Sequence, residues 1–287
     1  MINASTKLCC LIGCPVAHSV SPQMHNAAFK ALGLNYVYLA FEVAVEDLEK
    51  AVRGLKAIGV AGFNVTIPHK INVMKYLDEL DESAEETGAV NTVASEDGLL
   101  IGYNTDVYGV MKALEGFNLP KTKPALIIGA GGAARAAANA LMKIGFNEIV
   151  IANRTIEKAR QLADWIKSTG RKAHFHSLDR LGYIARGCGV IINATSIGML
   201  PHANETLLTS KDIPENSIVL DLVYNPPKTK LLREAERAGA KIISGIEVLI
   251  HQGARAFELW TRCKAPIDVM RKAVLAALEA EYRESSS

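Results

Sequence analysis

Residues 125–135 read ALIIGAGGAAR, an apolar run followed by a glycine-rich turn and a stretch of small residues. The apolar run predicts a buried strand, and the alanines from residue 134 onward predict a helix. In the G-x-G-x-x-A turn, Gly129 permits the tight turn, Gly131 lets a pyrophosphate approach the backbone, and Ala134 lets the helix pack on the strand. The helix N-terminus adds N–H groups and positive potential. The expected phosphate contacts are Gly129, Ala130, Gly131, Gly132 and Ala133.

The alternative interpretation is a tight turn that binds no ligand. The residues that follow the next predicted strand, 148–152, decide between these two interpretations. Asn153-Arg154-Thr155 follows this strand, 153 − 129 = 24 residues after Gly129. In a dinucleotide-binding unit an Asp or Glu at this place accepts from the 2′-hydroxyl of NAD. A carboxylate would repel a 2′-phosphate. Arg154, by contrast, can stack on the nucleotide and donate two hydrogen bonds to the phosphate, and Lys158 lies one helical turn further on. These residues favour NADP(H) over NAD(H), unless Arg154 and Lys158 only form a solvated basic helix start.

The chain from residue 125 repeats strand and helix. Predicted strands cover 125–128, 148–152, 190–194, 218–222 and 241–244, with helices at 134–144 and 156–169. Repeated βαβ units with glycine-rich turns predict a doubly wound, Rossmann-like sheet. Residues 116–124 interrupt the apolar pattern with Gly, Asn, Pro and Lys, which predicts a linker or domain edge.

The first hundred residues also alternate strand and helix, which is typical of a mostly parallel sheet covered by helices. Predicted strands cover 7–13, 36–43 and 62–67, and predicted helices cover 22–32 and 46–58. Residues 90–94 and 99–103 predict a hairpin at the sheet edge, around the turn Glu96-Asp97-Gly98. The C-terminal part is predicted to be helical at 247–261 and 266–283. The fold class is therefore α/β, with two domains.

Composition excludes several classes of protein. The 287 residues are 49% hydrophobic and 22% charged, with a formal net charge of +2, which is typical of a soluble globular protein. No basic stripe suits nucleic acid or a membrane surface, and no apolar run is long enough to span a bilayer. The five cysteines are odd in number and form no CxxC pair, which favours a reducing cytoplasm. The expected partner is a small-molecule substrate.

Polar residues cluster where predicted strands of the N-terminal half end, which is where parallel sheets bind ligands. The clusters are His18–Pro22, Asn64–Lys70, Gly88–Thr92 and Asn104–Asp106. Their hydroxyls and amides suit a polyhydroxylated, carboxylate-bearing small molecule; the residues concerned are Ser19, Ser21, Asn64, Thr66 and Asn91. Turn and cap chemistry is the alternative, with Ser21-Pro22 as N-cap and first helical residue. Lys70 and Asp106 are candidates for acid–base chemistry, with a surface salt bridge as the alternative.

Eight motifs in order make the chain resemble the shikimate dehydrogenase family from about Cys10 to about Trp260. Those of the N-terminal half are S-x-S-P at 19–22, N-V-T-x-P-x-K at 64–70, G-A-V-N-T at 88–92 and N-T-D-x-x-G at 104–109. Those of the second half are G-A-G-G-A-A-R at 129–135, N-R-T at 153–155, A-T-S-x-G-M at 194–199 and D-L-V-Y-N-P at 221–226. The resemblance implies reversible NADPH-dependent reduction of 3-dehydroshikimate to shikimate, in aromatic amino-acid biosynthesis.

The resemblance also implies roles for individual residues. Ser19 and Ser21 would hold the substrate carboxylate, and Lys70 and Asp106 would form the catalytic dyad. The ring hydroxyls would be bound by Thr66, Asn91 and Gln252, with Tyr224 nearby. The 2′-phosphate site would comprise Asn153, Arg154, Thr155 and Lys158. The nicotinamide pocket would be lined by Thr195, Met199 and Gly245.

The resemblance further implies a discontinuous architecture. Residues 1–105 would form the substrate domain, residues 106–245 the NADP-binding domain, and the helices of 246–287 would return to the first domain, as Gln252 requires. A quinate/shikimate dehydrogenase of broader specificity and a non-catalytic NADP-binding sensor are the alternatives. His174 and His176 are predicted to share one face of a strand, but no third ligand lies near them in sequence, so no metal is expected. We expect a monomer or homodimer.

Overall fold

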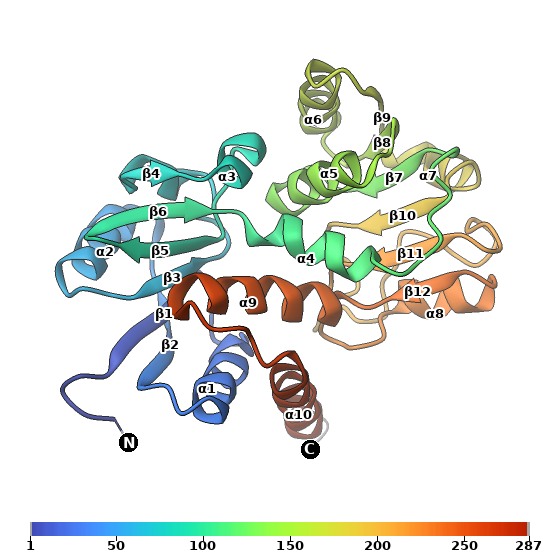
Figure 1. Cartoon of the computed structure of the whole chain (residues 1–287). Coiled ribbons are helices and arrows are strands. Elements are labelled where there is room, and N and C mark those ends of the chain that lie inside the picture. The colour runs from blue at the N-terminus through green and yellow to red at the C-terminus, as the bar shows by residue number, and fades with distance from the viewer. Residues whose placement is uncertain (1, 286–287) are drawn as a thin grey trace. The chain divides into compact units, whose positions relative to one another are not determined.

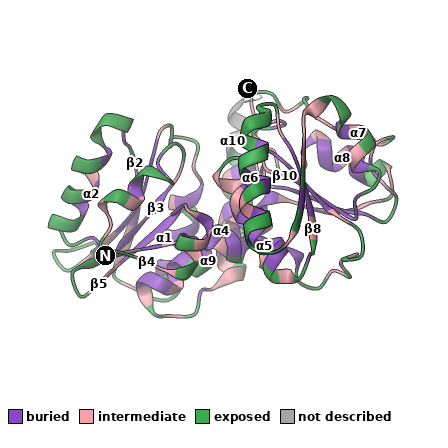
Figure 2. Cartoon of the chain, turned by 90° about the horizontal axis from the view of Figure 1, so that it is seen from above, coloured by how far each residue is buried: buried purple, intermediate pink, exposed green. Residues whose placement is uncertain are grey.

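The structure is a computed structural model that describes residues 2–285 (Figure 1). The chain forms two compact units, Met1–Tyr108 with Ile250–Ser287 (unit 1) and Gly109–Leu249 (unit 2). The changes from one unit to the other fall inside two helices, α4 (Thr105–Leu114) and α9 (Gly245–Thr261). In each unit the buried residues concentrate in the central strands, while the outer faces of the helices are exposed (Figure 2). The substrate and cofactor roles of the two parts of the chain stay predictions.

Unit 1 is built on a six-stranded sheet. Its strands are β1 (Lys7–Gly13), β2 (Tyr36–Glu42), β3 (Gly62–Val65), β4 (Glu79–Leu80), β5 (Thr92–Glu96) and β6 (Leu99–Tyr103). The order is β2-β1-β3-β5-β6-β4, and only β5 runs antiparallel to its neighbours. The predicted hairpin is β5–β6, but its place at the edge is wrong because β4 pairs outside β6. β4 has two residues, too few to show a strand pattern in the sequence.

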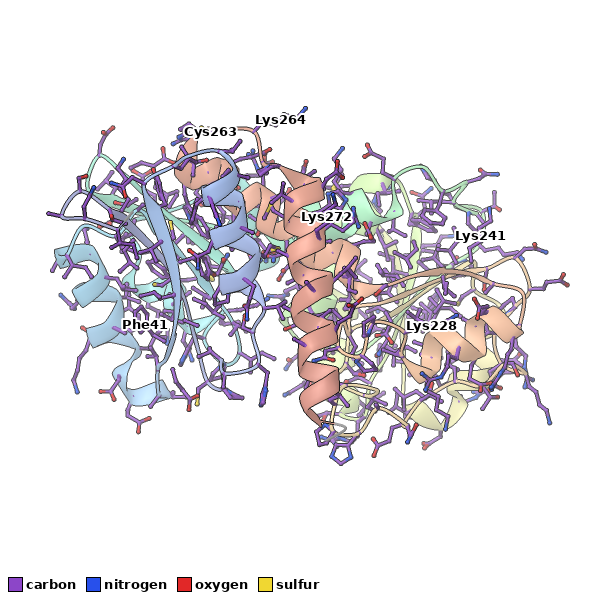
Figure 3. All side chains as sticks on the ribbon, turned by 90° about the horizontal axis from the view of Figure 1, so that it is seen from below. Phe41, Lys228, Lys241, Cys263, Lys264 and Lys272 are labelled. Carbon is purple, nitrogen blue, oxygen red and sulfur yellow. The ribbon has the colours of Figure 1, made fainter. Side chains whose placement is uncertain are left out.

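Helices cover the unit 1 sheet on both faces. They are α1 (Ser21–Ala31), α2 (Leu48–Ala57), α3 (Glu82–Thr87) and the part of α9 from Ile250, while α10 (Ile267–Ser285) packs against α1. The periodic residues Leu48, Val52 and Leu55 of α2 are buried in a core with the strand residues Ile12 and Phe63. The helix α3 was not predicted from the sequence because it is short. Its N-cap is Asp81, whose side chain accepts a hydrogen bond from the Ser83 N–H at 2.9 Å. Phe41 lies exposed on β2 (Figure 3).

Aromatic residues fill the other face of this sheet. Phe257 of α9 stacks on Phe29 of α1 with ring centroids 5.2 Å apart, and Trp260 lies 5.9 Å from Tyr38. The Trp260 indole N–H donates to the Val93 carbonyl at 2.9 Å, so the polar group of this buried ring is satisfied. α9 is therefore anchored directly on the sheet.

Gly62 is the residue that admits the Trp260 ring. A Cβ on Gly62 would overlap the ring and lie 2.5 Å from the Val93 oxygen. We expect Gly62→Ala to lower the free energy of unfolding by about 1–3 kcal/mol, the usual cost of overpacking. Urea unfolding measures this. Gly54→Ala is the matched control, because a Cβ at this position of α2 meets nothing within 4 Å; it should stabilise by about 0.5–1 kcal/mol. Equal effects of the two substitutions would contradict the argument.

Unit 2 is a parallel sheet of doubly wound topology. Its strands are β7 (Ala125–Ile128), β8 (Glu148–Ala152), β9 (Lys172–His176), β10 (Val190–Asn193), β11 (Ile218–Asp221) and β12 (Lys241–Ile243). The order is β12-β11-β10-β7-β8-β9, so the chain winds one way from β7 and then the other way from β10. Ligands bind in such sheets at the point where the order reverses, here between the ends of β7 and β10.

The helices of unit 2 follow the prediction except where they are short. α5 (Gly132–Ile144) begins two residues before the predicted start, and α6 covers Ile156–Ser168. α7 (Leu181–Ala185) and α8 (Lys230–Arg237) were not predicted. α8 nevertheless has a sequence signal, because Thr229 is its N-cap and accepts from the Leu232 N–H at 3.3 Å. Among the helices of the described residues, none is long and apolar enough to cross a membrane.

Candidate active site

The candidate residues of unit 1 gather at one edge of its sheet. Ser19 and Ser21 follow the end of β1, Thr66 follows β3, and Asp106 follows β6. Because β5 is antiparallel to β3 and β6, Asn91 lies at this same edge although it precedes its strand. Three of the polar clusters therefore lie at strand ends as predicted, whereas the cluster of Asn91 reaches the same edge from the start of its strand.

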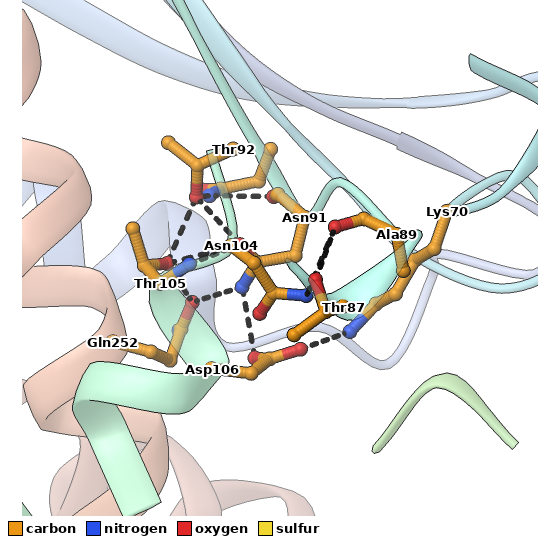
Figure 4. Close-up of polar contacts among 10 residues, drawn as sticks. Lys70, Thr87, Ala89, Asn91, Thr92, Asn104, Thr105, Asp106 and Gln252 are labelled. Carbon is orange, nitrogen blue, oxygen red and sulfur yellow. Dashed lines mark hydrogen bonds and ion pairs between the residues drawn. The ribbon is translucent and has the colours of Figure 1, made fainter. Parts of the chain in front are cut away.

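Lys70 and Asp106 form an ion pair at this edge. The Lys70 Nζ lies 2.6 Å from the Asp106 Oδ2, and the two side chains are only 20% and 18% exposed. The other carboxylate oxygen, Oδ1, accepts from the Asn91 amide at 2.8 Å (Figure 4). Asp106 thus holds the ammonium group in one orientation while the ammonium keeps further N–H bonds for a ligand oxygen.

A second set of contacts holds Asn91 itself. Its Oδ1 accepts from the Thr105 backbone N–H at 2.7 Å, which leaves the amide N–H bonds facing Asp106. The Gln252 Oε1 lies 3.4 Å from the Asn91 amide nitrogen and 3.5 Å from the Thr105 hydroxyl (Figure 4). Gln252 is the one member that comes from α9. A Cβ on the next residue, Gly253, would overlap the Met24 side chain, so this glycine allows α9 to approach α1.

Asn64 lies behind Asn91. Its amide donates to the Thr92 hydroxyl at 2.9 Å and to the Asn91 carbonyl at 3.2 Å, while its Oδ1 accepts from the Tyr38 hydroxyl at 2.7 Å. Asn64 is buried, and both amide hydrogens are donated inside the protein. The structure gives Asn64 a supporting position, and direct contact with substrate remains a prediction.

Three residues of this network were missed by sequence reasoning. Thr92 and Thr105 are buried, with their hydroxyl oxygens 2.9 Å apart, and Tyr38 is fully buried on β2. Burial holds the pKa of Tyr38 well above its ordinary value, while a hydrogen bond from Ser21 acts in the opposite direction. The two threonines had a signal, because each directly adjoins a candidate residue in its motif. Tyr38 had none, since an aromatic residue in a strand is ordinarily core.

The two serines lie at the start of α1. The helix begins at Ser21, and its N-cap is Val20, which makes no side-chain capping bond. The interpretation of Ser21 as N-cap is therefore wrong; it is the first helical residue, and the Ser19 hydroxyl accepts from its N–H at 3.3 Å. An N-terminus without a side-chain cap, flanked by hydroxyls, suits a carboxylate ligand. Asn104, which also had a cap interpretation, is buried and donates to the Thr87 hydroxyl at 2.9 Å.

The glycine-rich turn of unit 2 has the geometry that a pyrophosphate needs. Gly129 has φ = 117°, and a Cβ there would lie 2.8 Å from the Ala194 oxygen, so only glycine fits. At Gly131, by contrast, a Cβ would meet nothing within 4 Å, and α5 receives no side-chain capping bond from this residue. The backbone of the turn and the N-terminus of α5 are therefore open to a phosphate group.

The residues predicted to read the 2′-phosphate follow β8 and begin α6. Arg154, Thr155 and Lys158 are exposed, and Asn153 donates from its amide to the Thr155 carbonyl at 2.9 Å. In the part of the chain that the structure describes, neither Arg154 nor Lys158 pairs with an acidic side chain. Two basic side chains available beside a helix N-terminus fit NADP and its additional phosphate.

The predicted nicotinamide residues lie at the ends of neighbouring strands. Thr195 follows β10 and donates from its hydroxyl to the Asn193 Oδ1 at 2.7 Å, and Met199 is 47% exposed in the same loop. Tyr224 follows β11, which pairs with β10, and Gly245 begins α9. A Cβ on Gly245 would lie 2.6 Å from the Leu222 oxygen, so its lack of a side chain lets the segment after β11 approach.

The paired histidines of β9 form no metal site within residues 2–285. His174 lies 3.4 Å from the Glu148 carboxylate, and no group of three His, Cys, Asp or Glu side chains that could hold a metal ion occurs among the described residues.

A doubly wound unit with an open phosphate loop, joined in one chain to a unit that carries a lysine–aspartate pair, defines a two-domain, nucleotide-dependent oxidoreductase. Three family profiles match the chain. They are the shikimate dehydrogenase substrate binding domain at residues 11–93, shikimate / quinate 5-dehydrogenase at 112–225, and the shikimate 5′-dehydrogenase C-terminal domain at 245–275.

Individual relatives agree with these profiles over nearly the whole chain. The shikimate dehydrogenase (NADP(+)) of Methanopyrus kandleri is 52% identical over an alignment of 283 residues, and the match covers 96% of this chain and 98% of that protein. A crystal structure of a shikimate dehydrogenase in complex with NADP+ has a TM-score of 0.90 at 50% identity, covering 97% and 98% of the two chains. The Thermus thermophilus enzyme in complex with NADP(H) and shikimate has a TM-score of 0.85 at 37% identity, covering 95% and 100%. The chain belongs to the shikimate dehydrogenase family.

The hydroxyl of Thr92 is the node that joins Asn64, Asn91 and Thr105. We expect Thr92→Val to lower the free energy of unfolding by about 1–3 kcal/mol, because the buried Asn64 amide loses an acceptor. Thr92→Ser keeps the hydroxyl and removes one methyl group, so it should cost only about 0.8 kcal/mol. Urea unfolding of both variants measures the difference. A serine variant as unstable as the valine variant would show that packing, not the hydroxyl, matters.

Proposed function

We propose that the protein catalyses the reversible, NADPH-dependent reduction of 3-dehydroshikimate to shikimate in aromatic amino-acid biosynthesis. The observation that carries the proposal is the Lys70–Asp106 ion pair of 2.6 Å at the strand-end edge of unit 1, in a chain of this family. Unit 2 contributes the open phosphate loop and the basic residues that suit NADP.

The substrate is a ring with hydroxyls and one carboxylate, and the edge of unit 1 offers matching groups. Ser19 and Ser21, beside an α1 N-terminus without a side-chain cap, would bind the carboxylate. The hydroxyl of Thr66 and the amides of Asn91 and Gln252 can both donate and accept, as ring hydroxyls demand. Tyr224 of unit 2 would also contribute to substrate binding.

Lys70 is the proposed acid. When bound, NADPH supplies the hydride that the ketone carbon accepts. The ketone oxygen then becomes an alkoxide, and Lys70 stabilises this charge and delivers a proton from Nζ. Asp106 orients the ammonium group and can accept a hydrogen bond from a substrate hydroxyl. Asn91 holds the second oxygen of Asp106, so the carboxylate cannot rotate away from Lys70. In the oxidative direction the Lys70 amine takes the proton back.

A broader quinate/shikimate dehydrogenase is the nearest alternative, because the profile that matches residues 112–225 is described for both substrates. A non-catalytic NADP-binding sensor would not need the ion pair of Lys70 and Asp106. One spectrophotometric assay distinguishes them, with shikimate and quinate each tested against NADP+ and NAD+. Turnover of shikimate with NADP+ supports the proposal, turnover of quinate supports the broader enzyme, and NADP+ binding without turnover supports the sensor.

We also propose that the protein acts in the cytoplasm, as a monomer or homodimer. All five cysteines are free thiols, and three of them, Cys9, Cys10 and Cys188, are buried in the two units. A reducing compartment suits this pattern.

Replacing Lys70 tests the acid. Lys70→Ala should lower kcat by on the order of 10²- to 10⁴-fold, the range of a general acid–base contribution, with a smaller change in KM for shikimate. Lys56→Ala is the matched control: Lys56 is also paired with an aspartate of unit 1, Asp78, at 2.7 Å, but on the surface. Steady-state kinetics with saturating cofactor provide the measurement. An unchanged kcat for Lys70→Ala would remove Lys70 from the mechanism.

Replacing Arg154 tests its proposed role in binding the 2′-phosphate of NADPH. Arg154→Ala should raise KM for NADPH by about 10- to 100-fold, which corresponds to the loss of a charge-assisted hydrogen bond, with little change in KM for NADH. Arg160→Ala is the control, since Arg160 lies exposed on α6, shortly after Arg154, and pairs with Glu157 at 2.9 Å. If both cofactors were affected equally, Arg154 would have no part in reading the 2′-phosphate.

A further inference from the structure

Asp221, the last residue of β11, is a buried carboxylate that the mechanism above does not use. It is 0% exposed, and no cation pairs with it within the described residues. Three neutral donors satisfy it: Oδ1 accepts from the Asn193 amide at 2.8 Å and the Val223 N–H at 3.0 Å, and Oδ2 accepts from the Thr229 hydroxyl at 2.6 Å. A buried charge is costly unless it is hydrogen-bonded in this way.

The three donors belong to three different segments. Asn193 ends β10, Val223 opens the loop after β11, and Thr229 is the N-cap of α8. The loop that carries Tyr224 is therefore held to Asp221 at both ends, by Val223 and by Thr229.

Asn193 also forms hydrogen bonds with the loop after β10. Its Oδ1 accepts from the Thr195 N–H at 3.1 Å and from the Thr195 hydroxyl at 2.7 Å, and its amide donates to the Ile197 carbonyl at 3.3 Å. Asn193 can make all these contacts in one orientation only, because its amide must face Asp221 and its oxygen must face Thr195. Asp221 thereby sets the orientation of the side chain that shapes residues 195–197.

We propose that Asp221 is a positioning residue for the nicotinamide end of the cofactor site, tying the loop of Thr195 to the loop of Tyr224. The inference rests on the proposed function, which assigns these two loops to the cofactor and substrate. Gly245 adds to the same arrangement, because a Cβ there would lie 2.8 Å from the Asp221 backbone oxygen.

A carboxylate is required because all three neighbours donate. An amide in its place could keep the two contacts of Oδ1, but its NH2 group would have to donate to the Thr229 hydroxyl. That buried hydroxyl already accepts from the Leu232 N–H, and its own hydrogen would lose its acceptor. Burial also raises the pKa of Asp221 to about 6, against three hydrogen bonds that lower it. Above pH 6 the group is ionised and accepts all three bonds. Below about pH 6 the protonated form predominates, and its own hydrogen must be donated to the Thr229 hydroxyl, which reverses that contact.

Charged side chains in and just before α8 pair with groups other than Asp221. Lys228 pairs with Glu236 at 2.6 Å, Lys230 donates to the Asn204 carbonyl at 2.9 Å, and Glu234 pairs with Arg237 at 2.6 Å. None of them contributes to the shift of Asp221, whose causes are burial and its three donors. His202 also lies in the segment between β10 and β11, where it is exposed and its Nδ1 lies 3.4 Å from the Glu205 carboxylate. A pH effect near 6 is therefore assigned to Asp221 only where the Asp221→Asn variant lacks it.

The test is Asp221→Asn in the full-length protein. We expect weaker NADPH binding in a fluorescence titration and a kcat lower by on the order of 10- to 10²-fold, the cost of misplacing reacting groups by about 1 Å. KM for shikimate should rise as well, because Tyr224, the proposed substrate contact, lies on one of the two loops that Asp221 holds. For the wild-type protein we expect kcat to fall as the pH decreases through about 6, because Asp221 becomes protonated, and we expect this fall to be absent from the variant. Asp212→Asn is the matched control, because Asp212 also accepts from a threonine hydroxyl and a backbone N–H, both of Thr209, but at the surface.

Each outcome decides the proposal. Wild-type NADPH affinity, kcat and pH profile in Asp221→Asn would overturn it. If this variant does not fold, Thr229→Val removes one donor only and should weaken NADPH binding in the same direction, while Thr229→Ser restores it; equal behaviour of these two would also overturn the proposal. If the wild-type protein binds NADPH but turns over no 3-dehydroshikimate, the proposed function fails, and the comparison of NADPH affinities still decides the role of Asp221.

Discussion

The hydrogen bond by which Asn91 holds Asp106 beside Lys70 depends on the reversal of a single strand. β5 runs against its neighbours, so Asn91 at its beginning meets Asp106 at the end of the β6 segment. In an all-parallel sheet Asn91 would lie at the far edge, and one oxygen of Asp106 would be left without its partner. The position of the carboxylate, and with it the orientation of the Lys70 ammonium, follows from this topology.

Both units hold their functional loops by the same physical means. In unit 1 a buried amide and two buried threonine hydroxyls lie behind Asn91; in unit 2 a buried carboxylate lies behind Asn193 and the loops after β10 and β11. Each network is nearly free of water contact, so each unmade hydrogen bond would cost about 1–3 kcal/mol. This cost restricts the loops to one arrangement without disulfides or metal ions in the described chain.

Much of the fold was predictable because periodic segments of adequate length have an unambiguous pattern. The strands and helices around Gly129 follow the sequence to within two residues, and α2 buries the predicted Leu48, Val52 and Leu55. Short elements were missed, since β4, α3 and α7 contain too few residues for a pattern to repeat. The hairpin was misplaced for the same reason, because the strand outside it has only two residues. The longer helices α4 and α8 were not predicted either.

The sequence by itself determined which residues are the candidates for this protein's chemistry: a glycine-rich turn at Gly129 for phosphate, Arg154 for the 2′-phosphate, and Lys70 with Asp106 for acid–base chemistry. Such groups can be recognised because their residue types are few and their spacing is short. Only the tertiary structure decided which polar residues stand behind them. Asn64 became a support, Ser21 proved to be helical, and Tyr38, Thr92 and Asp221 gained roles, because burial and hydrogen-bond partners arise from strands that are distant in sequence.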